Sequence, residues 1–281
     1  METILSNRTW STIMWSWMVK CSAVHQRFRL GTKNQIILSS GRRLKTINLF
    51  FFRRRFVSLV VGCFASTGAL TQRYHQTHYE GCQQALAFYK AHRSEFVEAA
   101  KGTNLNARQL FCVVAPEISR YSEVQDWVEL GTMKLFYLQF GKGYADFSIG
   151  PFQMKPSFIE RMERQVEQDE FLRNSRSVQQ LANQGDEFQR RKNILDRLQT
   201  LSWQFKYLQL FCWIVEGKYP RKTFPSKSDE LAFYATLYNA GFHKNLEVIE
   251  QEMLKRRFPR DFHIRYNYSA VSKEFFEALG K

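Results

Sequence analysis

The chain has 281 residues, of which 44% are hydrophobic, so it is long enough to bury a substantial core. Its formal charge of +15 at pH 7 raises the question of a nucleic-acid partner, but the charge is unevenly distributed. Residues 1–55 contain eleven Lys or Arg and one acidic residue, which gives this segment +10 and leaves +5 for the rest of the chain. A balance of that size is common on ordinary surfaces, and no nucleic-acid-binding motif accompanies it, so we expect no nucleic-acid partner.

A stretch with the pattern of an export sequence follows the basic start of the chain. The stretch RRRFVSLVVGCFASTGALTQ begins at Arg53 and has the order of a secretory signal, with basic residues, a short apolar run and then small residues. The apolar run, at about residues 56–65, is too short to span a bilayer, which takes roughly 20 residues. We therefore expect residues 1–73 to be a basic segment with an export sequence and residues 74–281 to be the exported domain.

Two processing outcomes remain open for this segment. VVGC, residues 60–63, is similar to a bacterial lipobox, in which Cys63 is lipidated and becomes the mature N-terminus. TGA, residues 67–69, fits cleavage by ordinary signal peptidase instead. Either outcome predicts a protein of the bacterial cell envelope, periplasmic or anchored to the membrane on its periplasmic side.

The expected elements of residues 74–281 are helices, because apolar residues recur at spacings of three and four and no clear strand alternation is present. The fold class predicted is therefore all-α. In chain order, helices are expected at residues 85–102, 106–117 and 122–140, then as two polar helices within residues 160–196 that break near 183–187, and finally as one long central helix at residues 191–217. Asn104 or Asn106 is expected to cap the second of these helices.

The cysteines of residues 74–281 indicate neither a metal site nor a disulfide framework. Cys82, Cys112 and Cys212 have no CxxC spacing, and the last two sit in the apolar runs LFCVVA and LFCWIV. Cys112 and Cys212 are expected to be small buried apolar residues. We expect no metal and no cofactor.

The most unusual stretch is ADFSIGPFQMKPSFIE, residues 145–160, which sets a glutamine among apolar residues between two prolines. Three further segments stand in order around it. FCVVAPE ends on Glu117, ATLYNAGF contains residues 238–241, and RYNYSAVSKEF contains Tyr268. With these four segments, residues 107–276 resemble a lytic transglycosylase of the lysozyme-like superfamily, a divergent branch of the soluble lytic transglycosylase type.

The resemblance implies a lysozyme-like helical domain that cleaves the bond between MurNAc and GlcNAc in peptidoglycan. It makes Glu117 the catalytic acid, and its apolar helix is the setting that raises the pKa of such an acid. The other matching positions are implied to bind substrate, with Tyr268 also donating a hydrogen bond to Glu117; these positions are Gly150, Phe152, Gln153, Met154, Tyr238, Asn239 and Tyr268. The implied partners are peptidoglycan strands, together with a lipid anchor or cell-envelope proteins.

The sequence also departs from the family pattern. Ile118 intervenes between Glu117 and Ser119, which puts the role of that serine in doubt. The separation of Glu117 from Gln153 exceeds the usual one and implies an inserted helix at about residues 122–140, beside the cleft.

Two reaction outcomes are compatible with these residues. A transglycosylase uses one acid and forms 1,6-anhydro-MurNAc ends without water, whereas an inverting lysozyme needs a second carboxylate to activate water. Asp146 is the candidate for that second carboxylate, with Asp126 and Glu129 behind it. The competing interpretation is that Asp146 caps a turn. Because this interpretation leaves no second carboxylate to activate water, we favour the single-acid mechanism. An inactive glycan-binding or scaffold module is the remaining alternative, although such a module has less reason to keep Glu117.

Overall fold

The computed structural model describes residues 73–121, 123–174, 185–259 and 264–280. The chain divides into two units, residues 1–63 and 64–281, and the first of these lies outside the described residues. The predicted export sequence and the predicted lipidation of Cys63 therefore also lie outside them.

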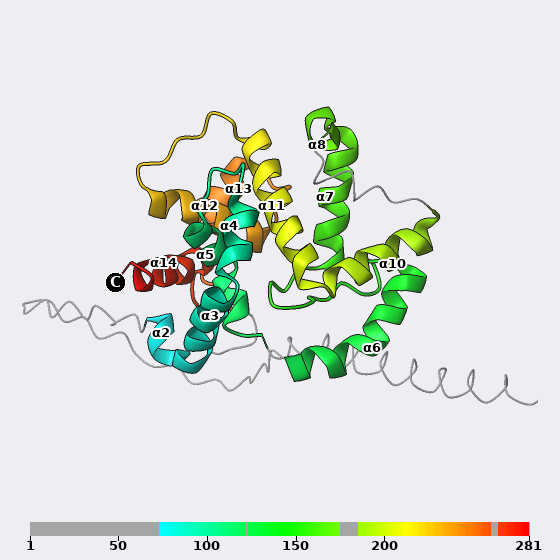
Figure 1. Cartoon of the computed structure of the whole chain (residues 1–281), viewed down its shortest axis with the longest axis horizontal. Coiled ribbons are helices and arrows are strands. Elements are labelled where there is room, and N and C mark those ends of the chain that lie inside the picture. The colour runs from blue at the N-terminus through cyan, green and yellow to red at the C-terminus, as the bar shows by residue number, and fades with distance from the viewer. Residues whose placement is uncertain (1–72, 122, 175–184, 260–263, 281) are drawn as a thin grey trace, which may run out of the picture. The chain divides into compact units, whose positions relative to one another are not determined.

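The described part of the chain is mainly helical, which confirms the predicted all-α class (Figure 1). It contains no strand, only two isolated antiparallel bridges, between Ile149 and Met154 and between Phe258 and Tyr266. The helices are α2 Tyr74–Thr77, α3 Tyr79–Ala91, α4 Arg93–Ala100, α5 Ala107–Ile118, α6 Glu123–Phe140, α7 Pro156–Gln168, α8 Glu170–Asn174, α10 Glu187–Leu198, α11 Leu201–Lys218, α12 Lys227–Ala240, α13 Leu246–Glu252 and α14 Tyr268–Ala278.

Helix α5 is the centre of one group of helices. It contacts α3, α4, α12 and α14, and every side chain from Leu110 to Ala115 is buried. The helix starts where the sequence predicts, because the side chain of Asn106 accepts a hydrogen bond from the backbone N–H of Gln109 at 2.9 Å. The side chain of Gln109 accepts one in return from the N–H of Asn106, which completes a capping box. Because α5 is buried and capped, the position of its last turn is fixed.

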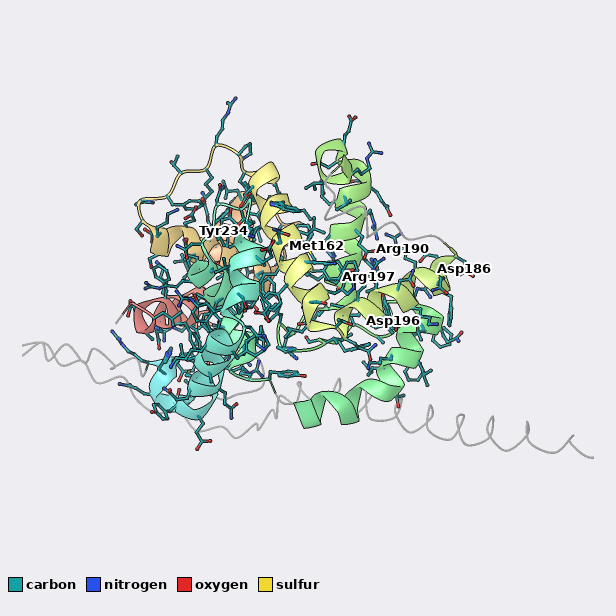
Figure 2. The ribbon with its side chains drawn as sticks, in the orientation of Figure 1. Met162, Asp186, Arg190, Asp196, Arg197 and Tyr234 are labelled. Carbon is teal, nitrogen blue, oxygen red and sulfur yellow. The ribbon has the colours of Figure 1, made fainter. Side chains whose placement is uncertain are left out.

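Helix α11 joins this group to a second group formed by α6, α7 and α10 (Figure 1). It contacts α4 and α12 on one side and α7 and α10 on the other. An ion pair to a buried carboxylate holds the second group together, with the half-buried Arg197 of α10 at 2.9 Å from the carboxylate of Glu163 on α7. The hydroxyl of Tyr207 on α11 donates to the same carboxylate at 2.7 Å, so three helices meet at this charge. Figure 2 labels Arg197 on α10.

The structure corrects two of the predicted helices. Residues 191–217 form parts of two helices, α10 and α11, because Thr200 adopts an extended conformation between them. Residues 85–102 are likewise divided between α3 and α4 at His92. Hydrophobic periodicity continues through both breaks, which is why the sequence did not reveal them.

Other predicted elements are confirmed. Helix α6 covers the predicted inserted helix and ends before Gly141, whose φ is +77°. Helix α10 begins after Asp186, which caps it by accepting from the N–H of Gln189, so a helix does begin at the predicted break. Cys112 and Cys212 are buried free thiols, as expected, and Cys82 is a third. No described helix combines the length and the apolar character needed to cross a bilayer.

The turn between α6 and α7 depends on a glycine and a buried glutamine. Gly150 has a φ of +68°, which residues with a side chain rarely adopt, and a Cβ added there would lie 1.8 Å from Nε2 of Gln204. Gln204, from α11, is 1% exposed and accepts a hydrogen bond from the N–H of Phe152 at 3.0 Å. Its amide nitrogen donates to the carbonyl oxygens of Leu198 and Ile149. The glycine therefore permits the close approach that fixes this turn.

Gly150→Ala is expected to destabilise the protein by about 2 to 5 kcal/mol, since left-handed strain and forced repacking each cost about 1 kcal/mol or more. Urea unfolding followed by circular dichroism measures this change. Gly131→Ala is the control, because a Cβ at Gly131 of α6 meets nothing within 4 Å. It should raise the stability by up to about 1 kcal/mol, as alanine favours helix. Equal stabilities of the two variants would contradict this account of the turn.

Candidate active site

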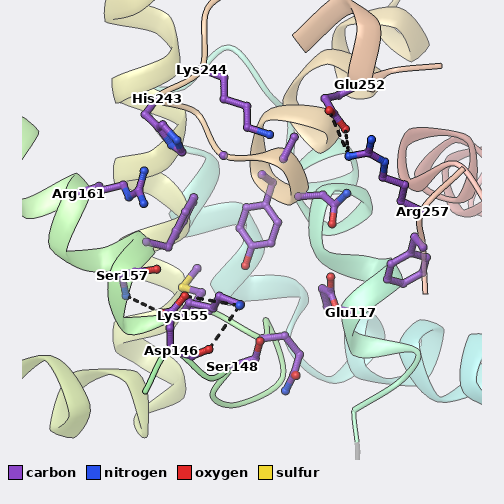
Figure 3. Close-up of a pocket in the computed structure, with 18 of the residues that line it drawn as sticks. Glu117, Asp146, Ser148, Lys155, Ser157, Arg161, His243, Lys244, Glu252 and Arg257 are labelled. Atoms are coloured by element: carbon purple, nitrogen blue, oxygen red, sulfur yellow. Dashed lines mark hydrogen bonds and ion pairs between the residues drawn. The ribbon is translucent and has the colours of Figure 1, made fainter. Parts of the chain in front are cut away.

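A cleft of about 590 Å³ lies where the two helix groups meet (Figure 3). Its walls come from the end of α5, the turn before α7, the first part of α7, the end of α12 with the loop after it, and residues around α13. The segments that carry the transglycosylase resemblance are distant in the sequence. The fold brings residues from three of them to this cleft, namely Glu117, the pair Gln153 and Met154, and the pair Tyr238 and Asn239.

Glu117 lies in the last turn of α5 and lines the cleft. The helix continues through Pro116 to Ile118, so the carboxylate is carried by the end of a buried helix. Two buried phenols lie near it. Burial raises the pKa of both Tyr238 and Tyr268 well above the usual value, and the negative charge of Glu117 raises each further. Both phenols therefore stay protonated, as neutral neighbours of the carboxylate, up to strongly alkaline pH.

Gln153 and Met154 reach the cleft from the turn that Gly150 and Gln204 hold. Gln153 has a φ of +50°, which is unusual for a residue with a side chain. Its amide nitrogen donates to the carbonyl oxygen of Gly150 at 2.9 Å, which commits one N–H. A ligand can use the other N–H and the amide oxygen. The strained backbone and this bond together fix the side chain at the cleft wall.

Two of the predicted substrate-binding residues belong to the core instead. Phe152 is fully buried, with ring centroids 5.0 Å from Phe205 and 5.9 Å from Phe96. Gly150 is buried beneath the amide of Gln204. Neither lines the cleft. The structure therefore places both residues in the support of the turn, away from the cleft surface where the prediction expected them.

Tyr238 and Asn239 lie at the end of α12. The hydroxyl of Tyr238 donates to the carbonyl oxygen of Phe152 at 2.6 Å, so this residue connects α12 to the turn. Asn239 is exposed in the cleft and can bind a ligand hydroxyl. Tyr268 differs from the prediction. Its hydroxyl donates to the carbonyl oxygen of Val113 at 3.1 Å, so its single proton is committed to α5 and not to Glu117.

Asp146 lines the cleft, as a second carboxylate would, but it also has two structural partners (Figure 3). One carboxylate oxygen accepts from the N–H of Ser157 at 3.2 Å, near the start of α7, and the other lies 3.6 Å from Nζ of Lys155. These contacts are those expected of a capping residue. Asp126 and Glu129 lie on α6 in a part where side chains are outside the described residues. The described side chains of α6, at residues 131–140, contribute nothing to the cleft wall.

Ser119, whose role the sequence left in doubt, has a structural one. Its hydroxyl donates to the carbonyl oxygen of Pro116 at 2.8 Å and accepts from the hydroxyl of Tyr74. The residue is buried and does not line the cleft. It joins α2 to the end of α5, close to Glu117.

Sequence reasoning missed most of the charged residues of the cleft. They come from five segments and include the basic residues Arg120, Lys155, Arg161, His243, Lys244 and Arg257 and the acid Glu252. The hydrogen bond from Lys255, at 2.9 Å, and the charge of Arg257 lower the pKa of Glu252. No sequence pattern connects these positions, because each is one charge among many on its own segment. Within the described residues, no three metal-ligating side chains form a group.

Comparisons of this chain with protein families, with characterised proteins and with solved structures found no match. The resemblance to lytic transglycosylases therefore depends on the matching residues and on their placement.

Tyr238→Phe is expected to destabilise the protein by about 1 to 3 kcal/mol, since it leaves the buried carbonyl of Phe152 without its hydrogen-bond donor. Tyr144→Phe is the control, because Tyr144 is 75% exposed, and it should change the stability by less than about 0.5 kcal/mol. Thermal and urea unfolding of both variants measure the difference. An unchanged stability for Tyr238→Phe would show that the link between α12 and the turn is unimportant.

Proposed function

We propose that this protein is a peptidoglycan lytic transglycosylase with a lysozyme-like domain, in which Glu117 is the catalytic acid. The observation that carries the proposal is the convergence of Glu117, Gln153 and Asn239 in one cleft, from segments that are far apart in the sequence. Each has the chemistry that its position requires: a carboxyl group to move a proton, and two amides to bind sugar substituents.

The proposed reaction uses Glu117 twice. Its carboxyl group donates a proton to the oxygen of the glycosidic bond as the bond from C1 of MurNAc to that oxygen breaks. The resulting carboxylate then accepts the proton of the C6 hydroxyl of the same MurNAc as O6 bonds to C1. The product is a 1,6-anhydro ring, no water is consumed, and Glu117 ends in its starting protonation state.

Two features of the cleft support the single-acid reaction. Asp146 already binds Lys155 and the N–H of Ser157, so its carboxylate is committed to the turn. Glu252 is paired with Lys255 and Arg257, which hold it as a stabilised carboxylate and make it a weak base. A hydrolytic lysozyme is the second candidate, because both carboxylates line the same cleft as Glu117.

The substrate implies the location. Peptidoglycan lies outside the cytoplasm, so the proposal requires an exported protein, in agreement with the signal-like stretch that begins at Arg53. We propose that the mature protein is periplasmic or is anchored to the envelope through Cys63.

Glu117→Gln should lower the rate of peptidoglycan cleavage at least about 100-fold, because the amide cannot donate a proton to the leaving oxygen. Release of soluble muropeptides from purified sacculi measures the rate. Glu80→Gln is the control, since Glu80 lies exposed on α3 away from the cleft, and it should retain full activity. Substantial cleavage by a folded Glu117→Gln protein would overturn the assignment of the acid.

The products distinguish the two reactions. Mass spectrometry of the released muropeptides should show 1,6-anhydro ends, lighter by one water than hydrolysis products. Asp146→Asn and Glu252→Gln should leave these ends unchanged, because neither carboxylate takes part in the one-acid reaction. Reducing ends, together with a loss of activity in either variant, would instead identify a water-activating base and a lysozyme.

A further inference from the structure

A cluster of basic side chains lies in the cleft on the side away from Glu117 (Figure 3). Arg161 comes from α7, and His243 and Lys244 come from the loop between α12 and α13. All three line the cleft. Arg161 and His243 also line an adjoining hollow of about 410 Å³, so the cluster stands where the two spaces join.

Arg161 and Lys244 differ in their pairing from Lys155 and Arg257, two other basic residues of the cleft. Lys155 pairs with Asp146, and Arg257 pairs with Glu252. Within the described part of the chain, no carboxylate lies at ion-pair distance from Arg161 or Lys244. The charge of Lys244 does act on Glu252, but that carboxylate is already bound by Lys255 and Arg257. Among the described residues, these two cationic groups of the cleft thus have no close counter-charge.

The lowered pKa of His243 reflects the same excess of positive charge. Partial burial lowers the pKa of its imidazole first, and the positive charges of Arg161, Lys244 and Lys218 lower it further. Lys218 of α11 donates hydrogen bonds to the carbonyl oxygens of Phe242 and Lys244, at 2.7 and 2.6 Å, and so fixes the loop that carries the cluster. An anion bound here would offset a repulsion that the folded protein otherwise retains.

The adjoining hollow continues the positive surface. Arg164 on α7 and Lys218 line it, and Asp169 is the acid among its described lining residues. The carboxylate of Asp169 accepts from the N–H of Leu172 at 3.2 Å, at the start of α8. The hollow therefore offers room and positive charge for a group that extends out of the cleft.

We propose that Arg161 and Lys244, with His243, form a subsite for a carboxylate of the peptide attached to the glycan strand. This inference rests on the proposed function. The N-acetylated sugars of peptidoglycan are neutral, and the anionic groups of the polymer are carboxylates of its short peptides. A cationic cluster beside the cleft, with a hollow next to it, fits a peptide that branches from the bound sugar. Guanidinium groups bind carboxylates through paired hydrogen bonds.

The test uses the full chain with Glu117→Gln, which should bind substrate without cleaving it. Isothermal calorimetry compares a disaccharide tetrapeptide with the same compound after its peptide carboxylates have been amidated. We expect amidation to raise the dissociation constant about tenfold, because it removes charge-assisted hydrogen bonds. A tenfold change corresponds to roughly 1.4 kcal/mol of binding free energy. Adding Arg161→Gln and Lys244→Gln should weaken binding of the acidic compound to the same extent and leave binding of the amidated compound unchanged.

The control carries Lys90→Gln and Arg93→Gln instead. Both residues are exposed on α3 and α4, outside the cleft, and their replacement lowers the net charge by the same amount. This control keeps the basic residues 1–55 and so separates the cluster from nonspecific attraction. It should bind both compounds as the Glu117→Gln protein does.

Three results would overturn the subsite. The first is equal affinity for the acidic and the amidated compound. The second is an equal loss of affinity for the acidic compound in the cluster variant and in the control. The third is that binding of poly(glycerol phosphate) depends on Arg161 and Lys244 while binding of the peptide does not. The last result would assign the cluster to a phosphate polymer. Charge-dependent binding of the peptide by a wild-type protein that never cleaves sacculi would instead refute the proposed reaction and leave the subsite standing.

Discussion

The arrangement of the cleft depends on the hydrogen bonds that the side chain of Gln204 makes to the backbone. This side chain is buried at the start of α11, and all its described hydrogen bonds are to backbone atoms that no helix satisfies. Through Leu198 it closes the end of α10, and through Ile149 and Phe152 it holds the turn before α7. A buried amide that lost these partners would cost about 1 to 3 kcal/mol for each unpaired group. The turn, α10 and α11 are therefore fixed together.

The same turn receives a second support from α12. The hydroxyl of Tyr238 donates to the carbonyl oxygen of Phe152, whose N–H is bound to Gln204. The backbone of one residue thus connects the two helix groups, while its ring packs in the core against Phe205 and Phe96. Gln153 follows directly and reaches the cleft from this fixed base. Precise placement of a binding residue requires this kind of support from buried neighbours.

Charge is arranged unequally around the cleft. Asp146 and Glu252 are each neutralised by neighbouring basic groups, whereas Arg161 and Lys244 have no close carboxylate among the described residues. Glu117 lies near the buried phenols of Tyr238 and Tyr268. Glu117 and the basic cluster of Arg161, His243 and Lys244 therefore line different sides of the cleft (Figure 3).

The sequence by itself determined the helical class and the burial of Cys112 and Cys212, and it narrowed the cap of α5 to Asn104 or Asn106, because these follow from periodicity, capping chemistry and local composition. The structure then selected Asn106. The sequence also identified Glu117, Gln153 and Asn239, which the fold brings to one cleft. The tertiary structure alone decided that Phe152 belongs to the core, that Tyr268 binds Val113, and that α10 and α11 separate at Thr200. It also gathered Arg161, His243 and Lys244. These outcomes depend on contacts between distant segments, which a local pattern of residues does not encode.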